Sequence, residues 1–189
     1  MKILIVNGSL GGAGGNTARL LKGLERAFAA RAELRYVHLN EEKSLPDLMS
    51  DLGWADGFVF STGTYWDSWG SPLQSFFEKI TPTEGTDLWL GKPAAVAVTM
   101  HAVGGKGVLS RLQGVLNTLG CSIPPMSGIV YSLSNQLALK ADSEFAADFW
   151  QPDDLAPIAE NLILAMGSNV KYRAWPVDRE DPHRRWISD

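Results

Sequence analysis

The amino-terminal part of the chain decides the fold, because a short apolar run there leads directly into a glycine-rich turn. The run is KILIV, residues 2–6, and the turn is NGSLGGAGGNT, residues 7–17. A short run without polar alternation is typical of a strand that is buried on both faces of a sheet. Apolar side chains then recur at helical spacing over residues 20–28, so the turn connects a strand to a helix.

The same alternation of strand and helix continues along the chain. Further strands are predicted at 33–39, 57–62, 94–99 and within 122–130, and further helices at 71–80, 108–119 and 155–166, the last one ended by Gly167. A short helix is expected within 46–53, and Ser71 is expected to cap a helix that has Pro72 in its first turn. Five strand–helix units predict a doubly wound parallel sheet with helices on both faces. Ligands bind such sheets at the carboxyl ends of the strands.

Length and composition predict a single globular domain. A chain of 189 residues favours one domain, and its net charge of −4 provides no basic surface for a nucleic acid. Cys121 is the only cysteine in the sequence, which excludes an internal disulfide and a cysteine-based metal cluster within one chain. The apolar run 2–6 is too short for a signal peptide or a membrane span. We therefore expect a cytoplasmic protein with no membrane partner, no nucleic-acid partner and no metal site.

The glycine-rich turn is suited to binding a phosphate. Backbone N–H groups at the start of a helix attract anions, and Ser9, Asn16 and Thr17 add side-chain donors. The P-loop motif is absent, and the dinucleotide motif fails because Thr17 stands where its last glycine should be. The turn has no Lys or Arg between Ser9 and Asn16, which favours a phosphate monoester that is bound rather than transferred. A plain flexible turn, in which Asn16 or Thr17 caps the helix, is the alternative.

Two further loops at the predicted carboxyl edge have unusual compositions. The loop STGTYWDSWGS, residues 61–71, holds two tryptophans and a tyrosine among small polar residues, and such rings can stack on a planar ligand. Alternatively, Trp66 and Trp69 only plug the end of the sheet or form an oligomer contact. The loop TMHAVGGKG, residues 99–107, has a glycine pair that permits close approach of a ligand. Its histidine, His101, lacks a visible carboxylate partner, so a structural or solvated role is the alternative to chemistry.

Three segments, taken in order, resemble the flavodoxin-like NADPH-dependent FMN reductase family, which includes small NAD(P)H:quinone reductases. The segments are GSLGGAGGNTARLL, ADGFVFSTGTYWDSWGSPLQSFFEK and GKPAAVAVTMHAVGGKGVLSRLQGVLNTLGC. The resemblance covers roughly residues 1–130, and it implies a five-stranded parallel sheet in the order 2-1-3-4-5. Gly63 stands where family members often have Pro, and Gln74 stands where Lys is common.

The resemblance also implies a cofactor and a reaction. It implies bound FMN, NADPH or NADH as co-substrate, and hydride transfer through FMN to a quinone, a flavin or a similar small-molecule acceptor. The implied cofactor-binding residues are Ser9, Gly15, Asn16, Thr17, Thr62, Gly63, Thr64, Tyr65, Trp66, His101, Gly104 and Gly105. No residue is expected to act as a catalytic acid or base, since the flavin carries the chemistry. A flavodoxin-type electron-transfer protein without a nicotinamide site, and a flavin-less binding protein, remain alternatives.

The end of the chain is expected to form a separate element. Residues 1–168 are predicted to be the FMN-binding domain, and residues 169–189 a tail. The tail contains Tyr172, Trp175 and Trp186, and disordered segments are usually poor in aromatic residues. We expect it to pack on its own domain or on a partner subunit, because the resemblance implies a homodimer or a higher homo-oligomer.

Overall fold

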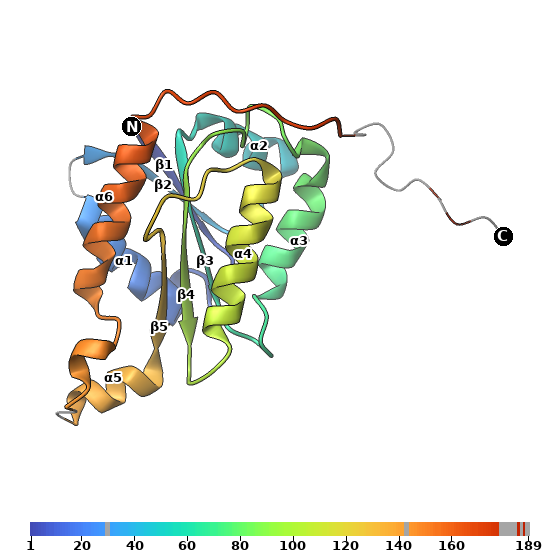
Figure 1. Ribbon diagram of the computed structural model, residues 1–189. Helices are drawn as coiled ribbons and strands as arrows, with labels where there is room; N and C mark the ends of the chain where they lie inside the picture. The colour runs from blue at the N-terminus through green and yellow to red at the C-terminus, as the bar shows by residue number, and fades with distance from the viewer. Residues whose placement is uncertain (29–30, 142–143, 178–184, 186, 188–189) are drawn as a thin grey trace.

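The protein is built around one parallel sheet (Figure 1). The computed structural model describes residues 1–28, 31–141, 144–177, 185 and 187. The strands are β1 (Lys2–Asn7), β2 (Glu33–His38), β3 (Gly57–Gly63), β4 (Ala94–Met100) and β5 (Gly128–Ser132). Their order is β2-β1-β3-β4-β5, and every neighbouring pair is parallel. The predicted flavodoxin-like order is therefore confirmed.

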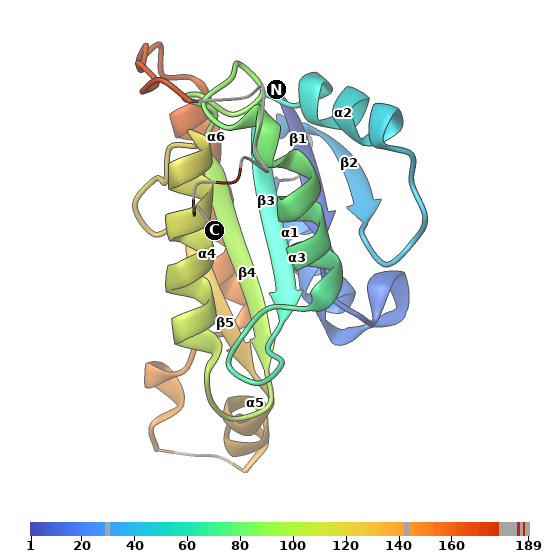
Figure 2. The same ribbon diagram turned by 90° about the vertical axis from the view of Figure 1, so that its right-hand side faces the viewer.

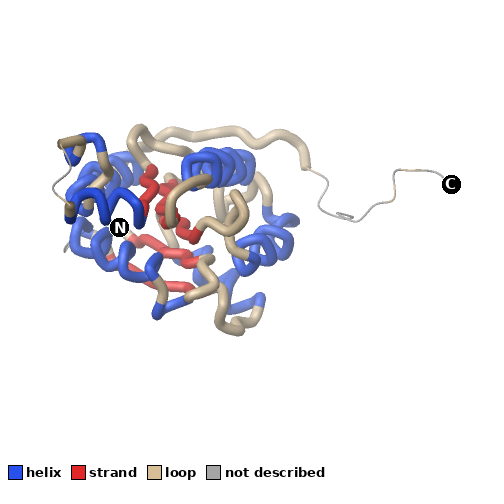
Figure 3. The backbone as a smooth tube through the Cα atoms, turned by 90° about the horizontal axis from the view of Figure 1, so that it is seen from below, coloured by secondary structure: helices blue, strands red, loops and turns tan. Residues whose placement is uncertain are grey.

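Helices cover both faces of the sheet, as Figures 1 and 2 show. One face carries α1 (Asn16–Phe28) and α6 (Leu155–Met166), and the other carries α2 (Leu45–Trp54), α3 (Ser71–Ile80) and α4 (Gly105–Leu119). Figure 3 shows the strands from below, between these two helical layers. Short 3₁₀ turns occur at Gly12–Gly14, Thr81–Thr83, Ala146–Asp148 and Pro152–Asp154.

The four central residues of β1, 3–6, are apolar because both faces of the strand are covered. Ile3 and Ile5 pack in the cluster that includes α1 and α6, whereas Leu4 and Val6 pack in the cluster under α2, α3 and α4. All four side chains are fully buried. Because successive side chains of a strand point to opposite faces, a strand covered on both sides needs apolar residues at every position.

The predicted element boundaries need three corrections. The fifth strand, predicted within 122–130, overlaps that range only at 128–130 and runs on to Ser132, since Pro124 and Pro125 interrupt the earlier part and proline cannot donate to a sheet ladder. The N-cap of α3 is Gly70, and Ser71 is the first helical residue. An unexpected helix, α5 (Leu133–Lys140), follows β5 and has no buried residue. The short helix expected within 46–53 is present as α2.

The chain after α6 crosses the amino-terminal end of the sheet, opposite the carboxyl ends of the strands (Figure 1). Trp175 Nε1 donates a hydrogen bond of 3.0 Å to Glu84 Oε1, and Tyr172 lies beside Gly91. The predicted tail residue Trp186 is outside the described residues. In the part of the chain that is described, no helix is both long and apolar enough to cross a membrane.

Candidate active site

Three loops meet at the carboxyl edge of the sheet, and we call them the edge loops: residues 8–15, 64–70 and 101–104. The first loop is held to β3 where Gly8 N donates to Ser61 O at 2.8 Å. The second loop is held to β4 where Thr64 N donates to Thr99 O, also at 2.8 Å. Strands β1, β3 and β4, which lead into the three loops, are neighbours in the sheet. The structure therefore brings together the three loops that the sequence singled out.

Asn7 shapes the first edge loop from the end of β1. Its side chain is fully buried, its Nδ2 donates to Gly12 O at 3.0 Å, and its Oδ1 accepts from Ser9 N at 3.1 Å. One amide therefore fixes both sides of the glycine-rich turn. The sequence prediction missed Asn7, although asparagine directly after an apolar strand is a signal, because its side chain bonds readily to nearby backbone.

The glycine-rich turn ends where α1 begins, which leaves the start of α1 accessible. Gly12 has a φ of +48°, and a Cβ at this position would collide with the side chain of Asn40, so glycine is favoured there. Asn16 is the first residue of α1 and is exposed. The hydroxyl of Ser9 is buried and accepts from Gly11 N at 3.3 Å, so its own proton can still be donated. This arrangement is compatible with an anion at the N-terminus of α1.

Thr17, which the sequence predicts to donate to a phosphate, is almost completely buried. Its side chain is 1% exposed, and its hydroxyl shares a hydrogen bond of 2.8 Å with the hydroxyl of Thr99 on β4. A hydroxyl has one proton to donate and can accept as well. Thr17 can therefore donate to a phosphate only while it accepts the proton of Thr99. Thr99 was not among the predicted site residues, because the sequence alone does not show this pairing.

The second edge loop is a tight hairpin turn with Trp66 at its tip. Tyr65 and Ser68 exchange backbone hydrogen bonds of 2.8 and 2.9 Å. Trp66 and Asp67 occupy the two central positions with φ values of +49° and +57°. The indole of Trp66 is fully exposed, whereas the ring of Tyr65 folds back against Gly63. Of the two aromatic residues predicted to contact a ligand ring, Trp66 projects into solvent and Tyr65 covers the end of β3.

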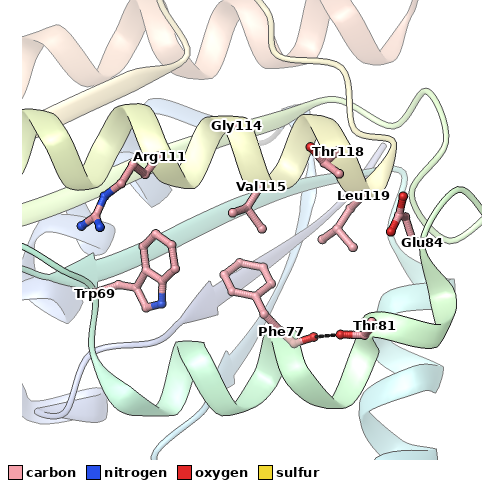
Figure 4. A pocket seen from close by; sticks show the side chains of 9 residues that line it. All are labelled: Trp69, Phe77, Thr81, Glu84, Arg111, Gly114, Val115, Thr118 and Leu119. Carbon is pink, nitrogen blue, oxygen red and sulfur yellow. Dashed lines mark hydrogen bonds between the residues drawn. The ribbon is translucent and has the colours of Figure 1, made fainter. Parts of the chain in front are cut away.

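Trp69 lies on the other side of the same loop, in a groove between α3 and α4. Its ring meets that of Phe77 edge-on at 6.0 Å, and its Nε1 donates to Gln74 Oε1 at 2.9 Å. The guanidinium of Arg111 lies over the indole, 5.3 Å from its centroid. Figure 4 shows Trp69, Phe77 and Arg111 along the groove. Trp69 is therefore part of a helix–helix surface and is separated from Trp66 by the turn.

The third edge loop closes against the second. Gly104 has a φ of +85° and precedes α4, and a Cβ there would collide with the carboxylate of Asp67. The next residue, Gly105, is buried at the start of α4. The side chain of His101 is exposed, and its carbonyl accepts from Ser134 N at 2.9 Å, which ties the loop to α5. His101 thus anchors α5 through its backbone.

A buried hydroxyl at this edge lacks a partner. In the part of the chain that the structure describes, Thr64 Oγ1 is buried and makes no hydrogen bond. Thr62, by contrast, donates to Gly63 O at 2.9 Å and accepts from Gly70 N at 3.0 Å. Most buried polar groups are hydrogen-bonded, so an orphaned one indicates a partner that is not part of the chain. Together with the accessible start of α1, the residues at this edge fit a ligand that carries an anionic group and a polar ring.

The single thiol is not positioned for chemistry at these loops. Cys121 is buried just after α4, at the opposite end of the sheet. Burial raises the pKa of its thiol to about 12, so the reactive thiolate is scarce at neutral pH.

Comparison of the whole structure with solved structures identifies oxidoreductases and a flavodoxin of the same fold. An oxidoreductase from Corynebacterium diphtheriae is 18% identical, with a TM-score of 0.68 over 88% of this chain and 97% of that one. FerB, a flavoenzyme NAD(P)H:(acceptor) oxidoreductase from Paracoccus denitrificans, is 22% identical, with a TM-score of 0.64 over 88% and 97%. A flavodoxin from Pseudomonas aeruginosa is 18% identical, with a TM-score of 0.61 over 89% and 100%. At such identities, these similarities establish the fold alone.

The family is established by the sequence. No curated protein matches the chain significantly. The sequence model of the family described as NADPH-dependent FMN reductase matches residues 1–136, which is well over half of the chain. The cofactor of this family is FMN and its co-substrate is a reduced nicotinamide, so both predictions are confirmed at the level of the family. The chain therefore belongs to the NADPH-dependent FMN reductase family.

Proposed function

We propose that this protein is an FMN-dependent NAD(P)H oxidoreductase that reduces a quinone, a free flavin or a similar small-molecule acceptor. One observation carries the proposal: at the carboxyl edge of the sheet, where the edge loops lie, the hydroxyl of Thr64 is buried and has no partner in the part of the chain that is described. An orphaned polar group at the ligand-binding edge of a doubly wound sheet supports a bound polar ligand there. Family membership supports FMN as that ligand.

The phosphate of FMN would lie at the N-terminus of α1. Its ligands would be the side chains of Ser9, Asn16 and Thr17 and the backbone around Gly15. The first N–H groups of a helix have no partner within the helix, and the helix dipole adds a partial positive charge. The loop contains no basic side chain, so these neutral donors would provide the anion binding.

The flavin ring would lie against the second and third edge loops. The residues proposed to surround it are Thr62, Gly63, Thr64, Tyr65, Trp66, His101, Gly104 and Gly105. When bound, FMN supplies the chemistry by accepting hydride from a reduced nicotinamide and passing the reducing equivalents to an acceptor. The chain binds and orients the reactants, and this requires neither a catalytic acid nor a base. Trp66, which is fully exposed, can also contact a planar acceptor.

The Thr64 hydroxyl offers a sharp test of this proposal. Thr64→Val removes an unsatisfied buried hydroxyl with little change in shape. The flavin-free protein should therefore become slightly more stable, while FMN affinity and NAD(P)H-dependent reduction of quinone or free flavin should fall. Ser110→Ala, which removes a hydroxyl at an exposed position on α4 outside the α3–α4 groove, should alter neither property.

The outcomes of this experiment separate the candidate functions. Three quantities are measured for both variants and the parent: the unfolding of the flavin-free protein, the binding of FMN, and the steady-state oxidation of NADPH and NADH. A parent protein that retains FMN but oxidises neither nucleotide would be a flavodoxin-type carrier. A parent protein that retains no FMN would be a flavin-less binding protein. Either outcome would overturn the proposed function.

We further propose that the α3–α4 groove binds a second copy of the chain. The groove has a volume of about 530 Å³, and its wall includes Phe77, Val115 and Leu119 (Figure 4). Arg111 and Glu84 lie toward opposite ends of it. In a two-fold symmetric dimer, each subunit contributes the same surface to the interface. The end of the groove near Arg111 in one subunit then faces the end near Glu84 in the other subunit. Opposite charges would then face each other, which supports a homodimer.

A further inference from the structure

Arg111 reaches from α4 to the hairpin turn that carries Trp66. Its guanidinium donates a hydrogen bond to the backbone carbonyl of Asp67 and covers the indole of Trp69 at 5.3 Å. Figure 4 shows the side chain extending from α4 toward Trp69. The indole is itself held by its hydrogen bond to Gln74 on α3. The turn is therefore attached to both helices that border the groove.

The turn needs such an attachment, because its backbone is strained. Two consecutive residues with positive φ form the type of hairpin turn that normally contains Asn-Gly or Asp-Gly. Here the two positions are occupied by Trp66 and Asp67, with φ of +49° and +57°. A bulky residue rarely adopts this conformation, so it persists only where the surroundings determine it. Without an outside anchor, the turn would relax and Trp66 would lose its position.

The contacts within the turn account for only part of its conformation. The backbone hydrogen bonds between Tyr65 and Ser68 close the hairpin, but they do not fix its orientation relative to the sheet. On the inner side, Asp67 lies against Gly104 of the third edge loop. On the outer side, the carbonyl of the same residue is held by Arg111. Asp67 is thus fixed from two directions, between the proposed ring site and the groove.

We propose that Arg111 is a positioning residue for flavin binding, which acts by holding the Trp66–Asp67 turn in its strained conformation. The proposal rests on the proposed function for the identity of the ligand, because Arg111 interacts with Asp67 and Trp69, which are not among the proposed FMN-binding residues. Its guanidinium provides both a donor for the carbonyl and a flat surface for the indole. Arg111→Met keeps an apolar stem on the indole and removes the donor. Arg111→Lys keeps a donor and a charge.

The first test needs no flavin. Hydrogen exchange is measured on the flavin-free parent, Arg111→Met and Arg111→Lys, and on Arg26→Met as a control at an exposed arginine of α1. Peptides that cover residues 64–70 should exchange faster in Arg111→Met, while exchange over the strands stays unchanged. Arg111→Lys should restore part of the protection, and Arg26→Met should match the parent. Equal exchange over 64–70 in the parent and Arg111→Met would overturn the proposal.

The second test measures flavin binding in a double-mutant cycle with Asp67→Gly. Glycine adopts positive φ without strain, so a turn that contains it needs the anchor less. We expect Arg111→Met to weaken FMN binding about tenfold in the parent background and clearly less in the Asp67→Gly background. The absorbance band of bound FMN should shift with Arg111→Met in the parent background only. Native mass is measured on each variant, because Arg111 also lines the α3–α4 groove.

The two tests distinguish failure of this inference from failure of the proposed function. If the parent binds FMN and Arg111→Met binds it with the same affinity and spectrum, the positioning role is wrong and the proposed function stands. If the effect of Arg111→Met is equal in both backgrounds, it does not act through the strained turn, and the inference is wrong. If the parent binds no FMN, the proposed function fails, and the exchange experiment still decides whether Arg111 holds the turn.

Discussion

The hydroxyl groups of Thr17 and Thr99 lie 2.8 Å apart and share a hydrogen bond that joins α1 to β4. The two residues are separated by 82 positions in the sequence. Thr17 is the last residue of the glycine-rich turn, and Thr99 lies on β4, two residues before the third edge loop. The pair therefore ties two of the edge loops together, and it places a hydroxyl at the start of the helix that is proposed to bind the phosphate.

Thr17→Val should weaken the binding of FMN more than that of riboflavin, which has no phosphate. Hydrogen bonds to charged groups contribute about 1.5–3 kcal/mol, so losing one should reduce FMN affinity roughly ten- to a hundredfold. Fluorescence titration of both flavins against parent and variant provides the four dissociation constants. Equal weakening of both flavins would mean that the Thr17–Thr99 pair shapes the pocket rather than binding the phosphate.

Thr99→Val separates these two roles further. It removes the partner of Thr17 but leaves the Thr17 hydroxyl free to donate. If Thr17 donates to the phosphate, Thr99→Val should reduce FMN affinity less than Thr17→Val does. If the two variants behave alike toward both flavins, the hydrogen bond serves only to hold α1 against β4.

Trp66→Ala should alter the bound flavin without affecting the fold. The side chain is fully exposed, and substitutions at such positions usually change stability by less than about 0.5 kcal/mol. We expect weaker FMN binding or a shifted absorbance band, together with an unchanged unfolding midpoint. Trp175→Ala, at a largely exposed tryptophan on the opposite end of the sheet, is the control and should leave the flavin spectrum unchanged. Identical spectra for Trp66→Ala and the parent would remove Trp66 from the proposed site.

Val115→Glu should dissociate the proposed dimer. Val115 lies on α4 in the apolar groove, and a carboxylate there would have to be desolvated between two copies. Sedimentation should give twice the chain mass for the parent and the mass of one chain for Val115→Glu. Trp69→Ala should weaken the dimer in the same direction, because its ring lines the same groove. A parent protein that remains monomeric at micromolar concentration would contradict this interface.

Asp51 should contribute an acid-sensitive part of the stability. Burial raises the pKa of this carboxyl, but hydrogen bonds from Lys43 and Arg35 outweigh burial and leave the pKa below its usual 3.8. A carboxyl whose pKa is lowered by folding stabilises the folded state above its unfolded pKa, and this contribution is lost as the pH falls through its folded pKa. The free energy of unfolding should therefore fall below about pH 4, and Asp51→Asn should flatten that fall.

Urea unfolding between pH 7 and pH 3 measures this effect. Asp148→Asn, at an exposed carboxylate, serves as the control and should retain the slope of the parent. Parallel pH profiles for Asp51→Asn and the parent would show that the contacts of Asp51 with Arg35 and Lys43 do not govern acid stability.

The sheet and its order could be predicted because periodicity and family resemblance agree on them. Strand β1 is apolar at four consecutive buried positions, 3–6, and α4 has a regular apolar stripe, so both are visible in the sequence. Helix α5 was missed because it buries none of its residues, so no face of it has to be apolar. Trp89 was missed although it is fully buried against Phe58, because it lies between α3 and β4 in a segment without periodicity.

The candidate site could be predicted at the level of loops but not at the level of contacts. The residue types of the edge loops predict ligand binding there, and the strands that lead into these loops are neighbours in the sheet. The bond between Thr17 and Thr99, the inward turn of Tyr65 and the contact from Arg111 all depend on tertiary packing. No local pattern encodes them, since each joins elements that are distant in sequence or depends on one side-chain conformation.

The most direct test of the central claim is an anaerobic titration of the FMN-reconstituted protein with NADPH, and then with NADH. The protein is incubated with excess FMN, desalted and examined by absorbance before nucleotide is added. The account predicts about one FMN retained per chain and loss of its visible absorbance on addition of stoichiometric NADPH or NADH. Retention of no FMN after reconstitution, or retained FMN that neither nucleotide reduces, would contradict the account.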